Sequence, residues 1–483
     1  MLPGVGGRCL LVSCLALAAC SEGGEAAPGS SGAPGTGLDV PEAGAVPYER
    51  VVFVTIDTLR ADHLASYGYF RRTSPFLDEL AERGVLFEAA MSASSHTAPS
   101  HASMFTGLPP GLHGLLTNGS QLPAEVTTTA EAFSSLGFDT AAFTSVEFLG
   151  GVADGFGHVR AKTSAAKAIS NAAISWIRKD RSSDRFFVWL HYYDPHRWKM
   201  LDRVPPEHAR AIAEATELGP RKVYREIAER HDLALPFEPA EWRSGDKGSE
   251  EVRTETLEQV LAYIDSYDAQ IAYADAEIRR VYDAIERLGL DGETLWIVTS
   301  DHGEGLGSHG YAGHGWQVYQ EQLRVPLVVH ATNGSLAPRR VQELVSLTDL
   351  LPTLVELYGA RLTGELAPWT GSSLVPLLGG NAAFERDPVF AQRRPLRKTG
   401  GDGVFALQDE RFKYVLRMTA EDEFFDLVRD PYEREGLPLD SEDAALLRAR
   451  LDRWLAQFAA AGLAPEEGVE AWHDELEKLG YAR

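Results

Sequence analysis

Four apolar runs occur along the chain, and the first three end abruptly at polar residues. They cover residues 50–56 (RVVFVTI), 186–190 (FFVWL), 294–298 (TLWIV) and 325–329 (VPLVV). Runs that are apolar at nearly every position are typical of strands buried on both faces, as in parallel sheets covered by helices. The pattern therefore predicts an α/β domain with a mainly parallel central sheet.

The polar residues that follow these runs are expected to meet at one edge of the sheet. Asp57 follows the first run, His191 follows the second, and Asp301 and His302 come shortly after the third. Open α/β sheets place their ligands at the carboxyl ends of the strands. We therefore expect these side chains to converge although they are far apart in the sequence.

Amphipathic stretches between the runs predict the covering helices. Residues 256–288 carry apolar side chains at three- and four-residue spacing, which is typical of a helix with one buried face. Residues 75–83 form a shorter predicted helix, with Ser74 as its N-cap and Pro75 at its first position. The polar residues 199–252 are expected to be a helical insertion that either roofs the site or has no role in binding.

Beyond about residue 380 the pattern changes to short alternating strands. These strands fall at residues 404–407, 412–416 and 423–426, and a helix is expected at residues 444–461. The sequence thus predicts a main domain at residues 46–380 and a C-terminal subdomain at residues 381–483, built from a small antiparallel sheet and a helix.

The N-terminal residues have the pattern of an export signal. A short apolar run follows Arg8 and ends in Leu-Ala-Ala-Cys at Cys20, which resembles the bacterial lipobox. We expect residues 1–19 to be a lipoprotein signal peptide, Cys20 to carry the lipid, and residues 20–45, rich in Gly, Ser, Pro and Ala, to form a flexible tether. The alternative is an ordinary cleaved signal peptide. The prediction is an exported bacterial lipoprotein of the cell envelope, at the outer membrane or the periplasmic face.

Composition excludes several classes of function. The formal net charge is −24 over 483 residues, and so acidic a chain repels nucleic acid. All three cysteines lie in the first twenty residues, so the remainder has neither a disulfide nor a thiolate metal ligand. The expected partners are an ester substrate, small or polymeric, of the envelope or its surroundings, and the membrane through the lipid anchor.

A metal ion is the simplest reason to place carboxylates and a histidine at strand ends. Hard divalent ions bind carboxylates, and a histidine nitrogen moves the preference toward zinc or manganese. Thr97 precedes Pro99 and Ser100, which are expected to open a helix, and a helix N-terminus favours bound anions. A hydroxyl at that position that touches a metal ion would ionise readily. The plain alternative is that Thr97 only caps the helix.

Segments with characteristic residues follow one another from about residue 48 to residue 440. They are VTIDTLRADHLASYG around Asp57, TAPSHASMFTG (97–107), LHYYDPH (190–196), YDAQIAYADAEI, VTSDHGEGLGSHG, YQEQLRVPLVV, SLTDLLPTLVELYG (346–359) and FFDLVRDPYEREGL (424–437). In order and spacing they resemble the motifs of the sulfatase family, in the alkaline phosphatase superfamily. The resemblance implies the alkaline-phosphatase-like sulfatase fold: a large mixed, mainly parallel sheet flanked by helices, with a small C-terminal antiparallel sheet and helix.

Several positions depart from the sulfatase pattern. Sulfatases carry a Cys or Ser that is oxidised to formylglycine, whereas this chain has Thr97, whose oxidation would give a ketone. The usual arginine is His101, and the second aspartate of the usual pair is Thr58. No lysine occurs in residues 144–147, where the resemblance places a sulfate-binding segment. Thr97 with Asp57, Asp301 and His302 instead resembles threonine-dependent members of the superfamily, which are phosphodiesterases and phosphoglycerol or phosphoethanolamine transferases.

The resemblance suggests roles for the histidines and for one further carboxylate. Thr97 is expected to be the nucleophile and also a metal ligand, with Asp57, Asp301 and His302 completing the metal site. The other expected catalytic residues are His196, His314 and His101, and the expected substrate-binding residues are His309, Asp194 and His191. Each histidine alone has a plain structural alternative, a residue satisfied by hydrogen bonds.

Three functions remain open from the sequence. The chain is expected to be a metal-dependent hydrolase of sulfate or phosphate esters, with a phosphodiesterase or phospho-group transferase as the first alternative. A binding lipoprotein of the same fold without catalysis is the second. The expected cofactor is one divalent ion, with zinc or manganese favoured and calcium as the alternative, and the presence of a second ion stays open.

Overall fold

The computed structural model describes most of the chain beyond the N-terminal segment. The described residues are 48–149, 151–197, 205–214, 240–244, 251–255, 257–311, 313–359, 370–380, 384–393, 403–418 and 420–461, all within the compact unit Gly37–Arg483. The predicted signal peptide (1–19), Cys20 and the predicted tether (20–45) lie outside them. In this described part of the chain no helix is long and apolar enough to span a bilayer.

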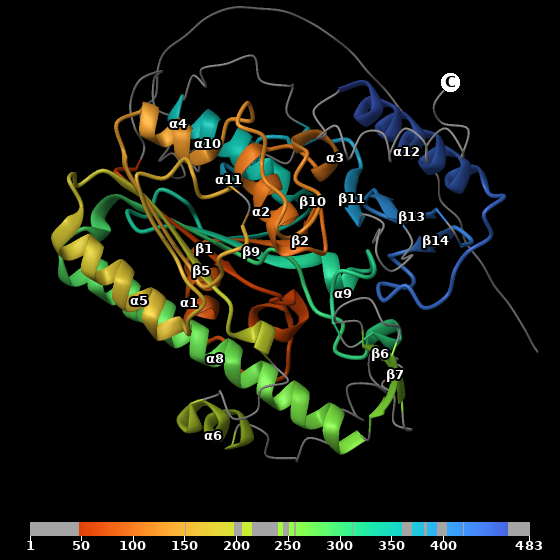
Figure 1. The fold of residues 1–483 in the computed structure, drawn as a ribbon, viewed down its shortest axis with the longest axis horizontal. Helices are drawn as coiled ribbons and strands as arrows, with labels where there is room; N and C mark the ends of the chain where they lie inside the picture. The colour runs from red at the N-terminus through yellow and green to blue at the C-terminus, as the bar shows by residue number, and fades with distance from the viewer. Residues whose placement is uncertain are drawn as a thin grey trace, which may run out of the picture. The chain divides into compact units, whose positions relative to one another are not determined.

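An eight-stranded sheet forms the centre of the unit (Figure 1). Its strands, in spatial order, are β10 (Arg339–Ser346), β2 (Val85–Met91), β9 (Arg324–Ala331), β8 (Thr294–Thr299), β1 (Arg50–Ile56), β5 (Phe186–Tyr192), β3 (Asp139–Thr144) and β4 (His158–Ala161). Strand β9 is antiparallel to both of its neighbours, and the other pairs are parallel. A mixed, mainly parallel sheet was predicted, but the parallel direction inferred for residues 325–329 was wrong.

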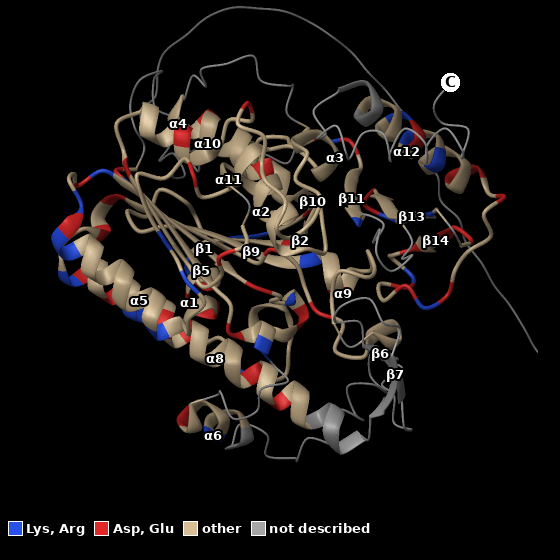
Figure 2. Ribbon diagram, viewed as in Figure 1, with Lys and Arg blue, Asp and Glu red and all other residues tan. Residues whose placement is uncertain are grey.

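Helices cover both faces of this sheet, so two hydrophobic cores form (Figure 1). One core packs the sheet against α2 (Thr97–Thr106), α4 (Thr129–Ser135), α10 (Leu350–Tyr358) and α11 (Val375–Leu378). The other packs it against α1 (Pro75–Arg83), α5 (Ala166–Ser175) and α8 (Leu257–Arg287). Burial on both faces explains why the central strands are apolar at nearly every position. Many of the charged residues lie on helices α8 and α12 (Glu442–Ala461) and on loops (Figure 2).

The long helix α8 follows the predicted amphipathic pattern. Its buried apolar residues include Ile264, Tyr267, Ile271 and Ile278, which recur at three-, four- and seven-residue intervals along one stripe. This spacing places them on one face, where they pack against the sheet and α5.

The predicted helical insertion at residues 199–252 is described only in part. It contains α6 (Pro206–Glu214), which contacts α8, but also the strand β6 (Ala240–Ser244), which pairs antiparallel with β7 (Glu251–Glu255). The remaining residues of this stretch lie outside the described residues, so its function as a roof over the site stays a prediction.

A second, four-stranded antiparallel sheet forms near the C-terminus. Its strands are β11 (Val389–Arg393), β12 (Val404–Gln408), β13 (Phe412–Arg417) and β14 (Glu423–Asp426), and α12 packs on β12 and β13. The last three strands and the helix were predicted, whereas β11 was not.

A buried charge network joins this C-terminal sheet to the segment before β9. Lys413 of β13 forms a fully buried ion pair with Glu433 at 2.6 Å, and Glu433 also accepts a 2.6 Å bond from the Gln320 backbone. His309 donates from both ring nitrogens, to the Glu321 carboxylate at 3.0 Å and to the Glu433 carbonyl at 3.1 Å. Burying Lys413 or Glu433 without its partner would cost free energy. The buried pair therefore stabilises the contact between the C-terminal sheet and the segment before β9.

Helix α1 begins differently from the sequence-based prediction. Ser74 occupies the N-cap position, but its side chain makes no capping bond. Instead the carboxylate of Asp275, in α8, accepts from the backbone N–H groups of Phe76 and Leu77 at 3.0 and 2.8 Å. A carboxylate from a neighbouring helix therefore satisfies the orphan donors of this N-terminus.

We expect Asp275→Ala to destabilise the protein by about 2 kcal/mol, because it leaves two buried N–H groups without an acceptor. The matched control is Ser74→Ala, which should change the free energy of unfolding by less than about 0.5 kcal/mol. Urea denaturation of both variants measures the difference. A larger loss in Ser74→Ala than in Asp275→Ala would contradict the assignment of the cap.

The His309 network predicts a stability that depends on pH. Burial disfavours the charged ring, but the hydrogen bond to Glu321 outweighs it and raises the pKa of His309 to about 9. A raised pKa stabilises the fold fully below about pH 6.5, the unfolded value, and this stabilisation is lost as the pH rises through about 9. His309→Ala should therefore cost about 1–3 kcal/mol at pH 6 and much less at pH 10, by denaturant titration at both pH values. An equal loss at both pH values would argue against a charged His309.

Candidate active site

The carboxyl ends of three neighbouring strands bring the predicted residues together. Strand β1 lies between β5 and β8, and Thr55 is level with His191 on one side and with Thr299 on the other. Asp57 follows β1, and Asp301 follows β8 by two residues. Parallel strands in register thus place these side chains at one edge of the sheet, as inferred from the sequence.

The turn after β1 is strained, and its conformation directs a backbone N–H group toward Asp301. Thr58 has a φ of +59°, a left-handed conformation that is rare for a β-branched residue. In this conformation the Thr58 N–H donates to Asp301 Oδ1 at 3.1 Å, and the Tyr267 hydroxyl donates to the Thr58 carbonyl at 2.6 Å. The His302 backbone N–H also donates to Asp301 Oδ1, at 2.9 Å. One oxygen of Asp301 is therefore fixed by the backbone, which leaves Oδ2 facing the site.

Helix α2 presents Thr97 from the opposite side. Thr97 is the first residue of the helix, one position later than a capping residue, and its side chain does not cap. The Ala98 N–H is instead satisfied by Asn118 Oδ1 at 2.8 Å, and Ser100 Oγ donates to the Asp301 carbonyl at 2.6 Å. The Thr97 hydroxyl is left to contact His302 Nε2, at 3.3 Å.

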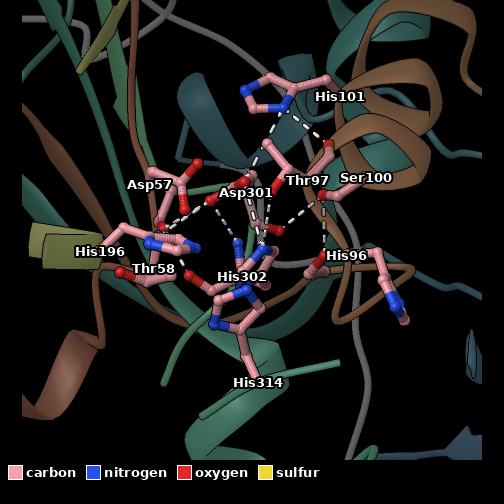
Figure 3. Close-up of polar contacts among 12 residues, drawn as sticks. Asp57, Thr58, His96, Thr97, Ser100, His101, His196, Asp301, His302 and His314 are labelled. Atoms are coloured by element: carbon pink, nitrogen blue, oxygen red, sulfur yellow. Dashed lines mark hydrogen bonds and ion pairs between the residues drawn. The ribbon is translucent and has the colours of Figure 1, made fainter. Parts of the chain in front are cut away.

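Four buried groups thus surround one position (Figure 3). One ligand atom from each of Asp57, Asp301 and His302 lies within 4.8 Å of the others, which is the only such His/Asp/Glu/Cys group among the described residues. Both oxygens of Asp57 and Oδ2 of Asp301 are buried and have no hydrogen-bond partner in the protein. Buried carboxylate oxygens without donors are costly unless a cation neutralises them, so these residues fit a divalent metal ion.

The pKa shifts of the two carboxylates also fit a divalent cation at this position. Burial, reinforced by the nearby Asp301, raises the pKa of Asp57 well above its usual range. Burial also disfavours ionisation of Asp301, but His302, His101 and His191 outweigh it and lower its pKa to about 2. Two close carboxylates without a cation cannot both ionise easily, whereas a divalent ion would stabilise both as anions.

His196 and His314, which are both partly exposed, lie beside His302 (Figure 3). The ring centroid of His314 is 4.4 Å from that of His302 and 4.8 Å from that of His196. Burial disfavours the charged form of His314, but the Glu304 carboxylate, 3.1 Å from Nδ1, outweighs it and raises its pKa to about 9. Burial, aided by His314, lowers the pKa of His196 to about 3. The site therefore pairs one charged imidazole with one neutral imidazole.

The other predicted residues have different surroundings from those expected. His101 is fully buried and uses both ring nitrogens within the protein, on the Thr97 carbonyl at 2.8 Å and on Thr55 Oγ1 at 3.0 Å. Neither nitrogen is left for an ester oxygen, so the structure gives His101 a positioning place rather than the expected catalytic one. His309 likewise has both nitrogens occupied, in the C-terminal network. Asp194, which follows β5, is buried and accepts a hydrogen bond from the backbone N–H of Ala166, the first residue of α5.

Three residues that shape the site were not predicted from the sequence. Glu304 sets the charge of His314, Thr55 contacts three buried side chains, and Asn118 caps α2. Glu304 lies two residues after His302 in the motif VTSDHGEGLGSHG, so its position was a signal. Nothing in the local sequence marks Thr55 or Asn118, because their partners are distant in the chain.

Two family models match the chain. One, described as "Sulfatase", matches residues 49–360, and the other, described as "N-sulphoglucosamine sulphohydrolase, C-terminal", matches residues 307–460. The first covers well over half of the 483 residues. Together they span the main sheet and the C-terminal sheet with its helix.

Curated relatives and solved structures agree with the family models. The Delta 4,5-hexuronate-2-O-sulfatase of Bacteroides thetaiotaomicron is 23% identical over 87% of this chain and 92% of its own length. A multifunctional alkaline phosphatase superfamily protein of Trinickia caryophylli is 24% identical over 83% of this chain and 93% of its own. The phosphonate monoester hydrolase of Agrobacterium radiobacter has the same fold, with a TM-score of 0.65, 22% identity and coverage of 85% and 96%.

The predicted family and fold are thereby confirmed. The mixed sheet with helices on both faces and the separate antiparallel sheet are those of the alkaline-phosphatase-like fold. Since the sulfatase model accounts for the residues from β1 to the end of α10, the chain belongs to the sulfatase family and is a sulfatase-like ester hydrolase.

Proposed function

We propose that this protein hydrolyses singly charged sulfate or phosphate-type esters by attack of the Thr97 hydroxyl, in a site that holds one divalent cation. The observation that carries the proposal is the contact of Thr97 with His302, beside the unpartnered oxygens of Asp57 and Asp301. The dipole of the helix that begins at Thr97 also favours an anion there.

Asp57, Asp301, His302 and Thr97 are the residues that would hold the ion. Two carboxylates, one imidazole and one hydroxyl suit zinc or manganese, because a nitrogen ligand is less favourable for calcium. When bound, a divalent ion supplies Lewis-acid chemistry: it stabilises negative charge and lowers the pKa of a coordinated hydroxyl.

The side chains themselves position the nucleophile and its proton. The Gly303 carbonyl accepts from His302 Nδ1 at 2.9 Å, so the neutral ring carries its lone pair on Nε2. That nitrogen lies 3.3 Å from the Thr97 hydroxyl, so its one lone pair is available to the ion that both residues would hold, and the Thr97 hydrogen passes to water as the oxygen attacks. The Thr97 oxygen attacks the sulfur or phosphorus, the bond to the leaving-group oxygen breaks, and water then cleaves the threonine ester.

His314 is the residue best placed to protonate the leaving group. Its raised pKa of about 9 keeps it charged near neutral pH, and Glu304 fixes one of its N–H groups. The remaining N–H can donate to an ester oxygen or to the departing alkoxide. The neutral His196, 3.0 Å from the Tyr193 hydroxyl, is a neighbouring contact for the same oxygen atoms.

Charge decides which esters suit the site. Asp57 and Asp301 together balance one divalent ion, and Glu304 balances His314, so little positive charge remains for the substrate. A sulfate monoester, a phosphodiester and a phosphonate monoester each carry one negative charge, whereas a phosphate monoester carries close to two at neutral pH. We therefore propose a preference for the singly charged esters. The names of the relatives, which include a hexuronate sulfatase and a phosphonate monoester hydrolase, support this range of substrates.

A transfer reaction is the second proposal for the same site. If an alcohol replaced water in the second step, the threonine ester would pass its group to that acceptor. The threonine at the nucleophile position favours this alternative, since the resemblance links it to phosphoglycerol and phosphoethanolamine transferases. A sulfated or phosphorylated polymer of the cell envelope would be the natural substrate of a lipoprotein anchored through Cys20, and we propose that location on the lipobox-like sequence.

We expect Thr97→Ala to lower kcat at least about 10³-fold, because the covalent route loses its nucleophile. Thr97→Ser keeps a hydroxyl and is the matched control, with a smaller loss expected. Steady-state kinetics on an aryl sulfate and an aryl phosphodiester measure both, with circular dichroism to check folding. Turnover in Thr97→Ala close to that of the natural protein would exclude the mechanism.

An aryl phosphate and its methyl diester form a matched pair that differs mainly in charge. We expect kcat/KM for the diester, and for the aryl sulfate, to exceed that for the monoester by at least about tenfold. Treatment with a chelator should abolish all of these activities, and zinc or manganese should restore them better than calcium. A preference for the phosphate monoester would contradict the charge argument, and activity that survives complete metal removal would contradict the cation.

A further inference from the structure

The hydroxyl of Thr55, two residues before Asp57, contacts three buried side chains. Thr55 Oγ1 lies 2.9 Å from Trp189 Nε1, 3.0 Å from His101 Nε2 and 3.1 Å from His191 Nδ1. All four residues are buried, and the Thr55 side chain has no exposed surface. A hydroxyl has one hydrogen to donate and two lone pairs to accept with, so these three contacts use all of its capacity.

Counting hydrogens fixes the direction of each bond. The Thr97 carbonyl can only accept, so the hydrogen of its 2.8 Å bond to His101 is on Nδ1. The neutral His101 then has a lone pair on Nε2, and Thr55 must donate its hydrogen there. Trp189 Nε1 can only donate, which leaves one lone pair of Thr55 for His191. His191 Nδ1 therefore donates to Thr55.

This chain of bonds determines which nitrogen of His191 faces the site. With its hydrogen on Nδ1, the neutral ring carries the lone pair on Nε2. His191 Nε2 is buried, has no hydrogen-bond partner in the protein and lies 3.5 Å from Asp57 Oδ2. When Asp57 is ionised, as a divalent cation would keep it, two acceptors face each other in the interior with no hydrogen between them. Such an arrangement is unfavourable unless a cation lies against both.

His302 shows the same arrangement on the other side of the group. Its Nδ1 donates to the Gly303 carbonyl at 2.9 Å, and its Nε2 faces Asp301 Oδ2 at 3.4 Å. Histidines that bind metals almost always donate their second ring N–H to a protein oxygen, which fixes the tautomer. In His191 the Thr55 hydroxyl does what the Gly303 carbonyl does in His302.

We propose that His191 Nε2 is a further ligand of the divalent cation, entering beside Asp57, and that Thr55 holds it in the binding tautomer. The inference rests on the proposed metal site and adds a residue to it. His191 does not belong to the compact group of Asp57, Asp301 and His302, so it reaches the ion from the Asp57 side. With bonds of about 2.1 Å, two ligands of one ion lie about 3 to 4 Å apart, which includes the 3.5 Å observed.

A second imidazole has a consequence for the choice of metal. Nitrogen ligands favour zinc and manganese over calcium, which prefers oxygen. His191 is therefore a residue that sets metal specificity. The rival explanation is that Nε2 accepts a proton from the substrate or water, in which case metal binding would not depend on His191.

The first test counts the histidine nitrogens that coordinate the ion. The purified full chain, produced with ¹⁵N-labelled histidine and stripped of metal, is loaded with Mn²⁺, and electron–nuclear double resonance resolves the coupled imidazole nitrogens. We expect two couplings in the natural protein and one in His191→Gln. A single coupling in the natural protein overturns the proposal while leaving the metal site intact. A protein that binds neither Mn²⁺ nor Zn²⁺ would overturn the metal site itself.

Calorimetric titration of the same proteins provides the second measurement. His191→Gln should weaken Mn²⁺ and Zn²⁺ binding at least tenfold and change Ca²⁺ binding by less than threefold. Thr55→Ser keeps the donating hydroxyl and should bind metals as the natural protein does, whereas Thr55→Val should weaken Mn²⁺ binding. Circular dichroism checks the fold of each variant. Unchanged Mn²⁺ affinity in a folded His191→Gln variant overturns the proposal and supports the proton-acceptor explanation.

Discussion

The burial of two carboxylates without hydrogen-bond donors is the constraint on which the rest of the site depends. Asp57 and Asp301 are wholly inaccessible to solvent, and three of their four oxygens have no partner in the protein. In water each of these oxygens would accept several hydrogen bonds, and their loss costs several kcal/mol. A divalent cation, as proposed for this site, would offset that cost. The neighbouring groups are arranged as acceptors, which is consistent with this proposal.

The fold supplies the constraint through strand register. Parallel pairing of β1 with β5 and β8 ends three strands at one level, and the turn at Thr58 brings the chain back toward Asp301. Helices on both faces exclude water from the strands and allow the carboxylates to be buried. The left-handed conformation of Thr58 costs about 1–3 kcal/mol, which the bonds to Asp301 and Tyr267 offset. Strain and burial thus occur at the same place, as is common at functional sites.

The sequence predicted those features whose cause is local. Buried strands are apolar throughout, so β1, β5 and β8 could be recognised, and the residues that follow them could be placed at one edge. The direction of β9 could not, because an antiparallel strand covered on both faces has the same apolar pattern as a parallel one. The cap of α1 by Asp275 was also inaccessible, since the partner lies about 200 residues away and Ser74 satisfies the local rule.

Among the histidines, residue type predicted the neighbourhood but not the role. His101, His191 and His302 are all buried around the same carboxylates, yet their partners differ. His101 contacts a carbonyl and a hydroxyl of the surrounding protein, and His191 contacts a hydroxyl at Nδ1 alone. His302 contacts a carbonyl at Nδ1, and its Nε2 faces the Thr97 hydroxyl inside the site. A ring with both nitrogens occupied can only position other groups, whereas a ring with one free lone pair can bind an ion. That distinction depends on atoms that the sequence does not place.

Similar contacts hold Thr97, the proposed nucleophile, in position. Its hydroxyl has one contact, with His302, but its backbone is held at the carbonyl by His101, and the next turn of α2 is tied through Ser100 to the carbonyl of Asp301. A β-branched side chain has few rotamers in a helix, so a fixed backbone largely fixes the oxygen as well. In the proposed mechanism His101 would position Thr97 without touching the ester, because it joins helix α2 to Thr55 and, through Thr55, to His191. Nucleophile and proposed metal ligand are then held by one network of buried bonds, and a change at Thr55 would disturb both.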